Sequence, residues 1–300
     1  LISFIAINLA PNSFFASGEL NPNITPEAIE ELKKIYGLDK PLYIQFFSWI
    51  YSILQLDFGI SFTSGEKVKE EILSRIPITL TINIVSMILI FIISLYFGIK
   101  SAMKKNSIFD RFTNQLSLLS FSMPSFYLAL VLVLVFSIKF ELFPIAGLHS
   151  VPNDGSLNYY LDFAWHLTLP IFIIVFGGIG SLILYIRALT IEILKSDYIF
   201  FARARGLDNK KILRYYILPN LYPPVITLLG LSLPGVIGGS VILETIFSID
   251  GMGLLFYQSA LSHDYPVIMG ILIIGAFLTL IGNMFADLIL LKLNPNYNEK

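Results

Sequence analysis

The sequence predicts an all-α protein, a polytopic bundle of membrane-spanning helices. Hydrophobic residues make up 55% of the 300 residues, charged residues only 14%, and the mean hydropathy is +0.75. A soluble domain is closer to about 25% charged. Apolar stretches of bilayer-crossing length recur along the chain, and the segments between them alternate between rich in and free of lysine and arginine.

Five stretches are long and apolar enough to cross a bilayer as helices. An earlier apolar fragment, residues 1–11, has about half the required length. We interpret this fragment as the outer end of a first, truncated helix, and therefore expect six spans in the full protein. Pro124, Pro170 and Pro234 predict kinks within spans. The five predicted spans are 79–100, 117–138, 167–188, 223–247 and 267–291.

The distribution of lysine and arginine predicts the orientation of these spans. The segments 100–116 and 187–221 carry several lysines and arginines, whereas 140–166 and 248–266 carry none. Basic loops stay on the cytoplasmic side, so we place the first two segments and both termini of the full protein inside. The resulting organisation is an extracytoplasmic segment at 12–78, a transmembrane domain at 79–292 and a cytoplasmic tail at 293–300.

The extracytoplasmic segment is predicted to have structure of its own. Thr25, Pro26 and Glu27 are typical of a helix start, and Gly37 is typical of a helix end. The following stretch, 41–56, is rich in aromatic residues but too short to span. We expect it to lie along the outer membrane interface.

Several classes of function are excluded or disfavoured by composition. The net charge of -1 argues against a nucleic-acid partner, and the absence of cysteine removes thiolate chemistry. His149, His166 and His263 are far apart in sequence, so we predict solvated loop histidines and no metal site. The chain has no glycine-rich phosphate loop of the form G-x-x-x-x-G-K-[ST] and no catalytic constellation within its spans. We therefore predict no catalytic residues and no cofactor on this chain.

The cytoplasmic loop 189–222 has the pattern of a helical hairpin. Asp197 is suited to cap a short helix ending at Ala204, after which Gly206 can leave the helical conformation. Asp208 is suited to cap a second helix that ends near Leu218–Pro219.

The first helix of this hairpin has features of a protein-contact surface. Ala202 and Ala204 are small enough for another protein to approach closely, while Arg203 and Arg205 offer charge-assisted contacts. The alternative is a basic loop that only satisfies the positive-inside rule.

The hairpin resembles the coupling loop of bacterial ABC importer permeases. That signature reads Glu-Ala-Ala, three residues, Gly, nine residues, Ile-x-Leu-Pro. Ala202, Gly206 and Leu218–Pro219 match it, whereas Phe200, Phe201 and Tyr216 depart from it. The fuller string DY-x4-ARARGL is similar to the version in the dipeptide, oligopeptide and nickel permease family. Strings resembling that family occur in the same order along nearly the whole chain: LAP, YGLDKPLYIQF, DFGISF, RIPITL, GGSVILETIFSIDGMG and HDYPVIMG.

The resemblance implies a type I ABC importer transmembrane fold in a bacterial cytoplasmic (inner) membrane. It implies that residues 197–208 form a coupling helix, docked in a cleft of an ATP-binding subunit. Its implied partners are a homologous second permease, two ATP-binding subunits or domains that hold ATP and Mg²⁺, and an extracytoplasmic binding protein. The implied cargo is dipeptides or oligopeptides, with nickel, a metal chelate or another small solute as the alternative.

A function of a different class is an ATP-independent secondary transporter. Such a protein would be expected to show repeated halves with broken helices, or charge relays within its spans, and the sequence shows neither. Among polar residues in predicted spans, Asn83 and Glu244 are candidates for lining or gating a pathway. For Glu244 and Asp287, which fall near helix ends, interfacial solvation or pairing within the bundle is a sufficient alternative.

Overall fold

The computed structural model describes residue 4, residues 40–232, residue 235 and residues 239–293, and this part of the chain is helical, with one isolated β-bridge between Ile60 and Lys67. Expectations for residues 1–11 and for a helix between Thr25 and Gly37 fall outside the described residues. The helices are α4 (Leu42–Leu54), α5 (Val68–Met103), α6 (Ile108–Ser122), α7 (Ser125–Leu132), η1 (Val133–Lys139), α8 (Leu157–Leu194), α9 (Asp197–Ala204), α10 (Asn209–Ile212), η2 (Leu213–Ile217), α11 (Leu218–Ser232), α12 (Val241–Ile246), α13 (Met252–Leu261) and α14 (Tyr265–Leu293).

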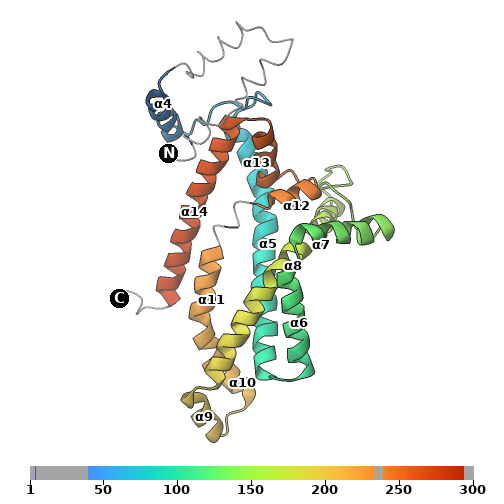
Figure 1. Ribbon diagram of the computed structural model, residues 1–300, viewed down its shortest axis with the longest axis vertical. Coiled ribbons are helices and arrows are strands. Elements are labelled where there is room, and N and C mark those ends of the chain that lie inside the picture. The colour runs from blue at the N-terminus through green and yellow to red at the C-terminus, as the bar shows by residue number, and fades with distance from the viewer. Residues whose placement is uncertain (1–3, 5–39, 233–234, 236–238, 294–300) are drawn as a thin grey trace.

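Three helices of the described chain are each long and apolar enough to cross a membrane: α5, α8 and α14. The helices α5 and α8 have 36 and 38 residues, which at a rise of 1.5 Å per residue makes them about 54 and 57 Å long. They pack along one another more extensively than any other pair in the fold, and α6 packs on α8 beside them. Figure 1 shows this group as the long axis of the molecule, with α11 and α14 alongside.

The predicted span 117–138 is not one straight helix. It divides into α6 and the continuous pair α7–η1, which are bent by 99° relative to each other. The break is at Met123 and Pro124: Pro124 disfavours a helical conformation in the residue before it, and Met123 is extended with ψ 121°. The kink predicted at Pro124 is thus confirmed, and Figure 1 shows α7 projecting sideways from the bundle.

The predicted span 223–247 is also interrupted. Helix α11 begins earlier, at Leu218, and ends at Ser232, while α12 covers only Val241–Ile246. Just before α12, Gly239 has φ +65°, which lies outside the right-handed helical region. The expectation for Pro234 falls on a residue outside the described part of the chain. Pro170, by contrast, lies inside α8, which continues as one helix on both sides of it.

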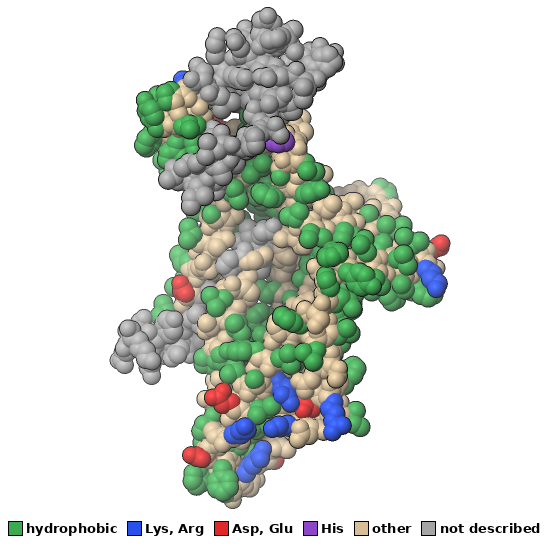
Figure 2. Space-filling model, viewed as in Figure 1, with side chains coloured by type: hydrophobic (Ala, Val, Ile, Leu, Met, Phe, Trp, Pro, Cys, Tyr) green, Lys and Arg blue, Asp and Glu red, His purple; other side chains and the backbone are tan. Residues whose placement is uncertain are grey.

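The buried residues form clusters at different heights of the molecule. An inner cluster joins α5, α8, α9 and α11 through residues such as Ile99, Ile186 and Leu221. A middle cluster joins α5, α8 and α12, and an outer cluster joins α5, α13 and α14. Figure 2 shows lysine and arginine gathered at the end of the molecule that carries α9, opposite α4 and α13, as the predicted orientation requires.

Helix α4 corresponds to the aromatic stretch 41–56, which is predicted to be too short to span the membrane. It has 13 residues, so it is too short to span a bilayer. Tyr43, Phe47, Tyr51 and Leu54 are exposed and recur at intervals of three to four residues, which places them on one face. An exposed apolar face of this kind suits the predicted position along the membrane interface.

Candidate functional site

The hairpin that is predicted to face the cytoplasm forms as its pattern predicts, with two differences. Helix α9 covers Asp197–Ala204, but its N-cap position is Ser196, and Asp197 lies in the first turn, where its charge favours the positive end of the helix dipole. Gly206 has φ +79°, a conformation that glycine adopts without steric cost. Asp208 accepts a hydrogen bond from the backbone N–H of Lys211 at 2.9 Å and so caps α10.

The second helix of the hairpin does not end near Leu218–Pro219. A π-helical turn, η2, carries the chain from α10 directly into α11, which continues to Ser232. The Leu-Pro pair therefore lies where the hairpin joins a bundle helix. A displacement of the hairpin would reach α8 on one side and α11 on the other.

Helix α9 has two distinct faces. Ile199 and Ala202 are each 1% exposed, and Ile199 belongs to the inner cluster, where Ile186 of α8 is also buried. Ala202 is buried within its own chain, and its contact with another protein stays a prediction. Phe200 and Phe201 face outward and are 69% and 63% exposed.

The outward face of α9 combines apolar and cationic character. Arg203, Ala204 and Arg205 are exposed beside the two phenylalanines, so these predicted contact residues are available to another protein. Exposed aromatic and arginine side chains are the residue types most enriched at protein interfaces. Phe200 and Phe201 are not among the contact residues predicted from the sequence, because they depart from the general signature.

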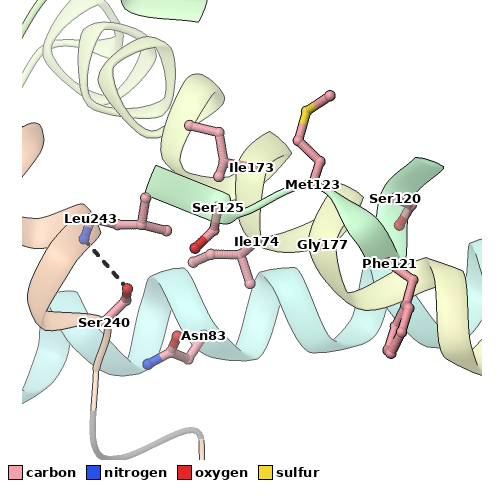
Figure 3. Close-up of a pocket in the computed structure, with 10 residues that line it drawn as sticks. All are labelled: Asn83, Ser120, Phe121, Met123, Ser125, Ile173, Ile174, Gly177, Ser240 and Leu243. Atoms are coloured by element: carbon pink, nitrogen blue, oxygen red, sulfur yellow. Dashed lines mark hydrogen bonds between the residues drawn. The ribbon is translucent and has the colours of Figure 1, made fainter. Parts of the chain in front are cut away.

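An open cavity of about 400 Å³ lies among α5, α8 and α12, at the break between α6 and α7. Gly177, on its wall, is 20 residues after the start of α8 and 17 residues before its end. Figure 3 shows the predicted residue Asn83 on one wall and Ser120 and Ser125 on either side of the break. The full lining is Asn83, Ser120, Phe121, Met123, Ser125, Ile173, Ile174, Gly177, Ser240 and Leu243.

The cavity lining carries hydrogen-bonding groups but no ionisable side chain. A solute inside it would therefore meet amide and hydroxyl groups set among apolar ones. Such a lining can exchange hydrogen bonds with a polar solute without binding one sign of charge tightly.

Glu244, the other predicted pathway residue, is turned away from this cavity. It is 4% exposed, accepts a hydrogen bond from the N–H of Leu254 at 2.9 Å and lies 3.2 Å from the hydroxyl of Thr79. The hydroxyl of Thr79 in turn accepts the N–H of Met252 at 2.9 Å. The carboxylate thus ties α12 to the start of α13 and to α5, while Ser240 and Leu243, also near or on α12, line the cavity.

Glycines make room for this buried carboxylate. A Cβ atom at Gly239, Gly251 or Gly253 would lie 2.6, 2.6 or 3.0 Å from an oxygen of Glu244. The sequence string that contains these residues was noted only as a resemblance, and Thr79 was not singled out at all. Because Thr79 and Glu244 are 165 residues apart, no local signal connects them.

The histidines differ from expectation. His166 is buried in α8, and its Nδ1 lies 2.9 Å from the backbone oxygen of Asp162, so it is not a solvated loop residue. His149 Nδ1 and His166 Nδ1 lie 3.6 and 3.5 Å from the carboxylate oxygens of Asp162. Within the described residues, no group of three or more candidate ligands is arranged to hold a metal ion. Asp287 is exposed, in agreement with the solvation alternative.

Comparison with known proteins decides the family. Residues 94–299 match the family described as "Binding-protein-dependent transport system inner membrane component", and residues 1–83 match the N-terminal part of the same kind of membrane component. The chain belongs to this family. The permease is therefore an inner-membrane component of a binding-protein-dependent transport system, and the sequence-based assignment is confirmed.

Relatives and a solved structure agree with this assignment. The permease is 35% identical to the oligopeptide transport system permease protein AppB of Bacillus subtilis, over 98% of this chain and 92% of AppB. It is 31% identical to the metal-staphylopine import system permease protein CntB of Staphylococcus aureus, over 93% of this chain and 85% of CntB. Its fold is similar to a chain of the inward-facing MetNI methionine ABC transporter, with a TM-score of 0.59 at 17% identity, covering 74% of this chain and 96% of that chain.

Proposed function

We propose that the permease forms part of the passage of an ATP-driven importer of dipeptides and oligopeptides, and that a separate ATP-binding subunit drives it by contact with α9. ATP and Mg²⁺ bind on that subunit and not on this chain. A homologous second permease completes the passage, two ATP-binding subunits or domains serve the pair, and an extracytoplasmic binding protein delivers the solute. The family to which the chain belongs, and the name of its Bacillus subtilis relative, support this proposal.

The two faces of α9 are the observation on which the proposal depends. An eight-residue helix, anchored in the inner cluster by Ile199 and with Ala202 also buried, presents Phe200 and Phe201 to the cytoplasmic side. Two neighbouring phenylalanines exposed to water are unfavourable unless a partner covers them. A helix anchored on one face and covered on the other can pass a rigid-body displacement from the partner to α8 and α11.

The cavity supports peptides as cargo. Peptides carry side chains of every charge, but all share backbone amides that donate and accept hydrogen bonds. The neutral lining offers the amide of Asn83 and the hydroxyls of Ser120, Ser125 and Ser240, and it adds no fixed charge that would favour one class of side chain. Discrimination among cargoes then rests mainly with the binding protein.

A metal chelate is the second candidate, favoured by the similarity to a metal-staphylopine permease. A neutral passage also suits a ligand-wrapped metal ion, whose charge is largely covered by its chelator. Competition distinguishes the two: unlabelled tripeptides should reduce uptake of a radiolabelled tripeptide by cells, and chelated nickel should not. If cells lacking the permease take up the tripeptide normally but lose accumulation of chelated metal, the peptide assignment is wrong.

Gly206→Val tests the role of the hairpin. Valine is strongly disfavoured at φ +79°, and because no atom lies within 4 Å of the added Cβ, the change acts on the backbone conformation alone. We expect the assembled complex to lose uptake and substrate-stimulated ATP hydrolysis together. Gly155→Val is the matched control, because Gly155 has φ +69° and equally open surroundings but lies in an outer loop. Normal uptake and normal stimulation in Gly206→Val would refute the proposed role.

A further inference from the structure

Asp110, at the start of α6, is the centre of a buried polar cluster that joins three helices. It is 2% exposed, and its two carboxylate oxygens accept hydrogen bonds from Nε and Nη2 of Arg187 on α8 at 2.7 and 2.9 Å. The hydroxyl of Ser101 on α5 donates to the same carboxylate, as do the backbone N–H of Asn106 and the amide of Asn114. The two-point contact with Arg187 fixes both distance and orientation between α6 and α8.

The other end of α6 is attached to α8 as well. The hydroxyl of Ser120 donates a hydrogen bond to the backbone oxygen of Phe176. Close by, the backbones approach so tightly that a Cβ atom at Gly180 would lie 2.5 Å from the oxygen of Ser117. Helix α6 is therefore held to α8 at both ends and cannot slide or rotate along it without breaking one of these contacts.

These attachments connect the hairpin to the cavity. Arg187 follows Ile186, a member of the inner cluster on which α9 rests through Ile199. At the far end of α6, Ser120 and Phe121 form part of the cavity wall, directly before the break at Pro124. A displacement that enters at α9 thus has a continuous route through α8 and α6 to the cavity.

We infer that the Asp110–Arg187 pair makes α6 follow α8, so that the α6 wall of the cavity moves when the ATP-binding subunit displaces α9. Asp110 and Arg187 are positioning residues in this inference, which rests on the function proposed above. Apolar packing alone would stabilise the α6–α8 contact, and a buried ion pair adds little net stability over apolar residues. What the pair adds is a fixed register between two helices that must move together.

The experiment uses the complete complex, purified with its partner subunits and reconstituted in liposomes with its binding protein. Asp110→Asn removes the charge but keeps the side-chain shape, and Arg111→Gln is the matched control, since Arg111 is an exposed neighbour in the same helix. The measured quantities are recovery of the ATP-binding subunit, basal ATP hydrolysis and the number of radiolabelled tripeptides imported per ATP hydrolysed. We expect Asp110→Asn to lower the number of tripeptides imported per ATP hydrolysed by about tenfold. Recovery of the ATP-binding subunit and basal ATP hydrolysis should stay within about twofold of wild type.

Exchanging the two charges tests the pair through the import of tripeptide per ATP, a quantity that a purely structural role would leave unchanged. The double variant D110R/R187D should import more tripeptide per ATP than D110R alone, because it restores the pair in the opposite sense. If Asp110→Asn leaves the import per ATP unchanged, or lowers uptake only in proportion to the complex recovered, the inference is overturned.

If Asp110→Asn yields no complex, Arg187→Lys carries the test, because it keeps the positive charge but loses the two-point contact with Asp110 that fixes the register of α6 on α8. It should lower import per ATP by about twofold or more, and a wild-type ratio would overturn the inference. Failure of the proposed function looks different: the wild-type complex itself would show no ATP-binding subunit in contact with α9.

Discussion

Gly251 leaves no room for a side chain, and Gly251→Ala is therefore a sharp test of the Glu244 contacts. A Cβ atom there would lie 2.6 Å from Oε2 of Glu244 and 2.7 Å from Oγ1 of Thr79. Neither oxygen can retreat freely, because each accepts a backbone N–H at 2.9 Å, from Leu254 and Met252 respectively. Overpacking costs about 1–3 kcal/mol, and loosening a hydrogen bond to a carboxylate costs about 1.5 kcal/mol or more, so we expect a loss of about 2–4 kcal/mol.

Heat inactivation of the purified complex measures this loss, because membrane complexes rarely unfold reversibly. A loss of about 2 kcal/mol corresponds to a roughly 30-fold faster rate if it is fully expressed in the unfolding barrier. We therefore expect Gly251→Ala to shorten the half-life of ATP hydrolysis at a fixed temperature by at least about tenfold. Gly275→Ala is the matched control, because a Cβ at Gly275 in α14 meets nothing within 4 Å.

A double variant identifies the carboxylate as the cause. Glu244→Asp withdraws the carboxylate by one methylene and makes space for the new methyl group. The pair G251A/E244D should therefore be less damaged than the sum of the two single changes. Strict additivity, or a Gly251→Ala complex as long-lived as Gly275→Ala, would refute the close approach of Glu244 to Gly251.

Two further predictions concern the outward face of α9 and the cavity. The double change of Phe200 and Phe201 to serine should leave the permease in the membrane at normal levels, because both side chains are exposed. It should lower the affinity for the ATP-binding subunit by at least about tenfold. Co-purification at graded concentrations of the ATP-binding subunit measures this affinity. Normal co-purification would show that these side chains are not the contact. Ser125→Trp should obstruct the cavity and reduce tripeptide uptake while basal ATP hydrolysis continues, whereas Ser125→Ala should transport normally. Uptake through the Ser125→Trp permease at the wild-type rate would place the passage elsewhere.

The features that could be predicted are those set by local chemistry. Hydropathy located the regions of α5, α8 and α14, because each must be apolar over a bilayer's thickness. The hairpin was predicted from Gly206 and Asp208, since a left-handed φ and a helix cap are decided within a few residues. Basic residues gather at the end that carries α9, and the cytoplasmic orientation of that end stays a prediction.

The features that could not be predicted depend on contacts between distant segments. Pro124 indicates a break, but the 99° angle between α6 and α7 follows from what each helix packs against. The orientation of Ala202 toward its own core could not be read from its small size, which suits an inward and an outward contact equally. Asp110 and Arg187 are 77 residues apart, and nothing near either of them in sequence indicates that they meet.

The length of α8 has a mechanical consequence. Gly177, at the level of the cavity, is 17 residues from the inner end of the helix, which is about 26 Å at 1.5 Å per residue. A rocking motion of about 10° centred at that level would sweep the tip by roughly 4–5 Å, close to one helical turn. A displacement of this size at the inner end of α8 would therefore barely move the residues beside the pivot at Gly177, and parts of α8 would shift in proportion to their distance from it.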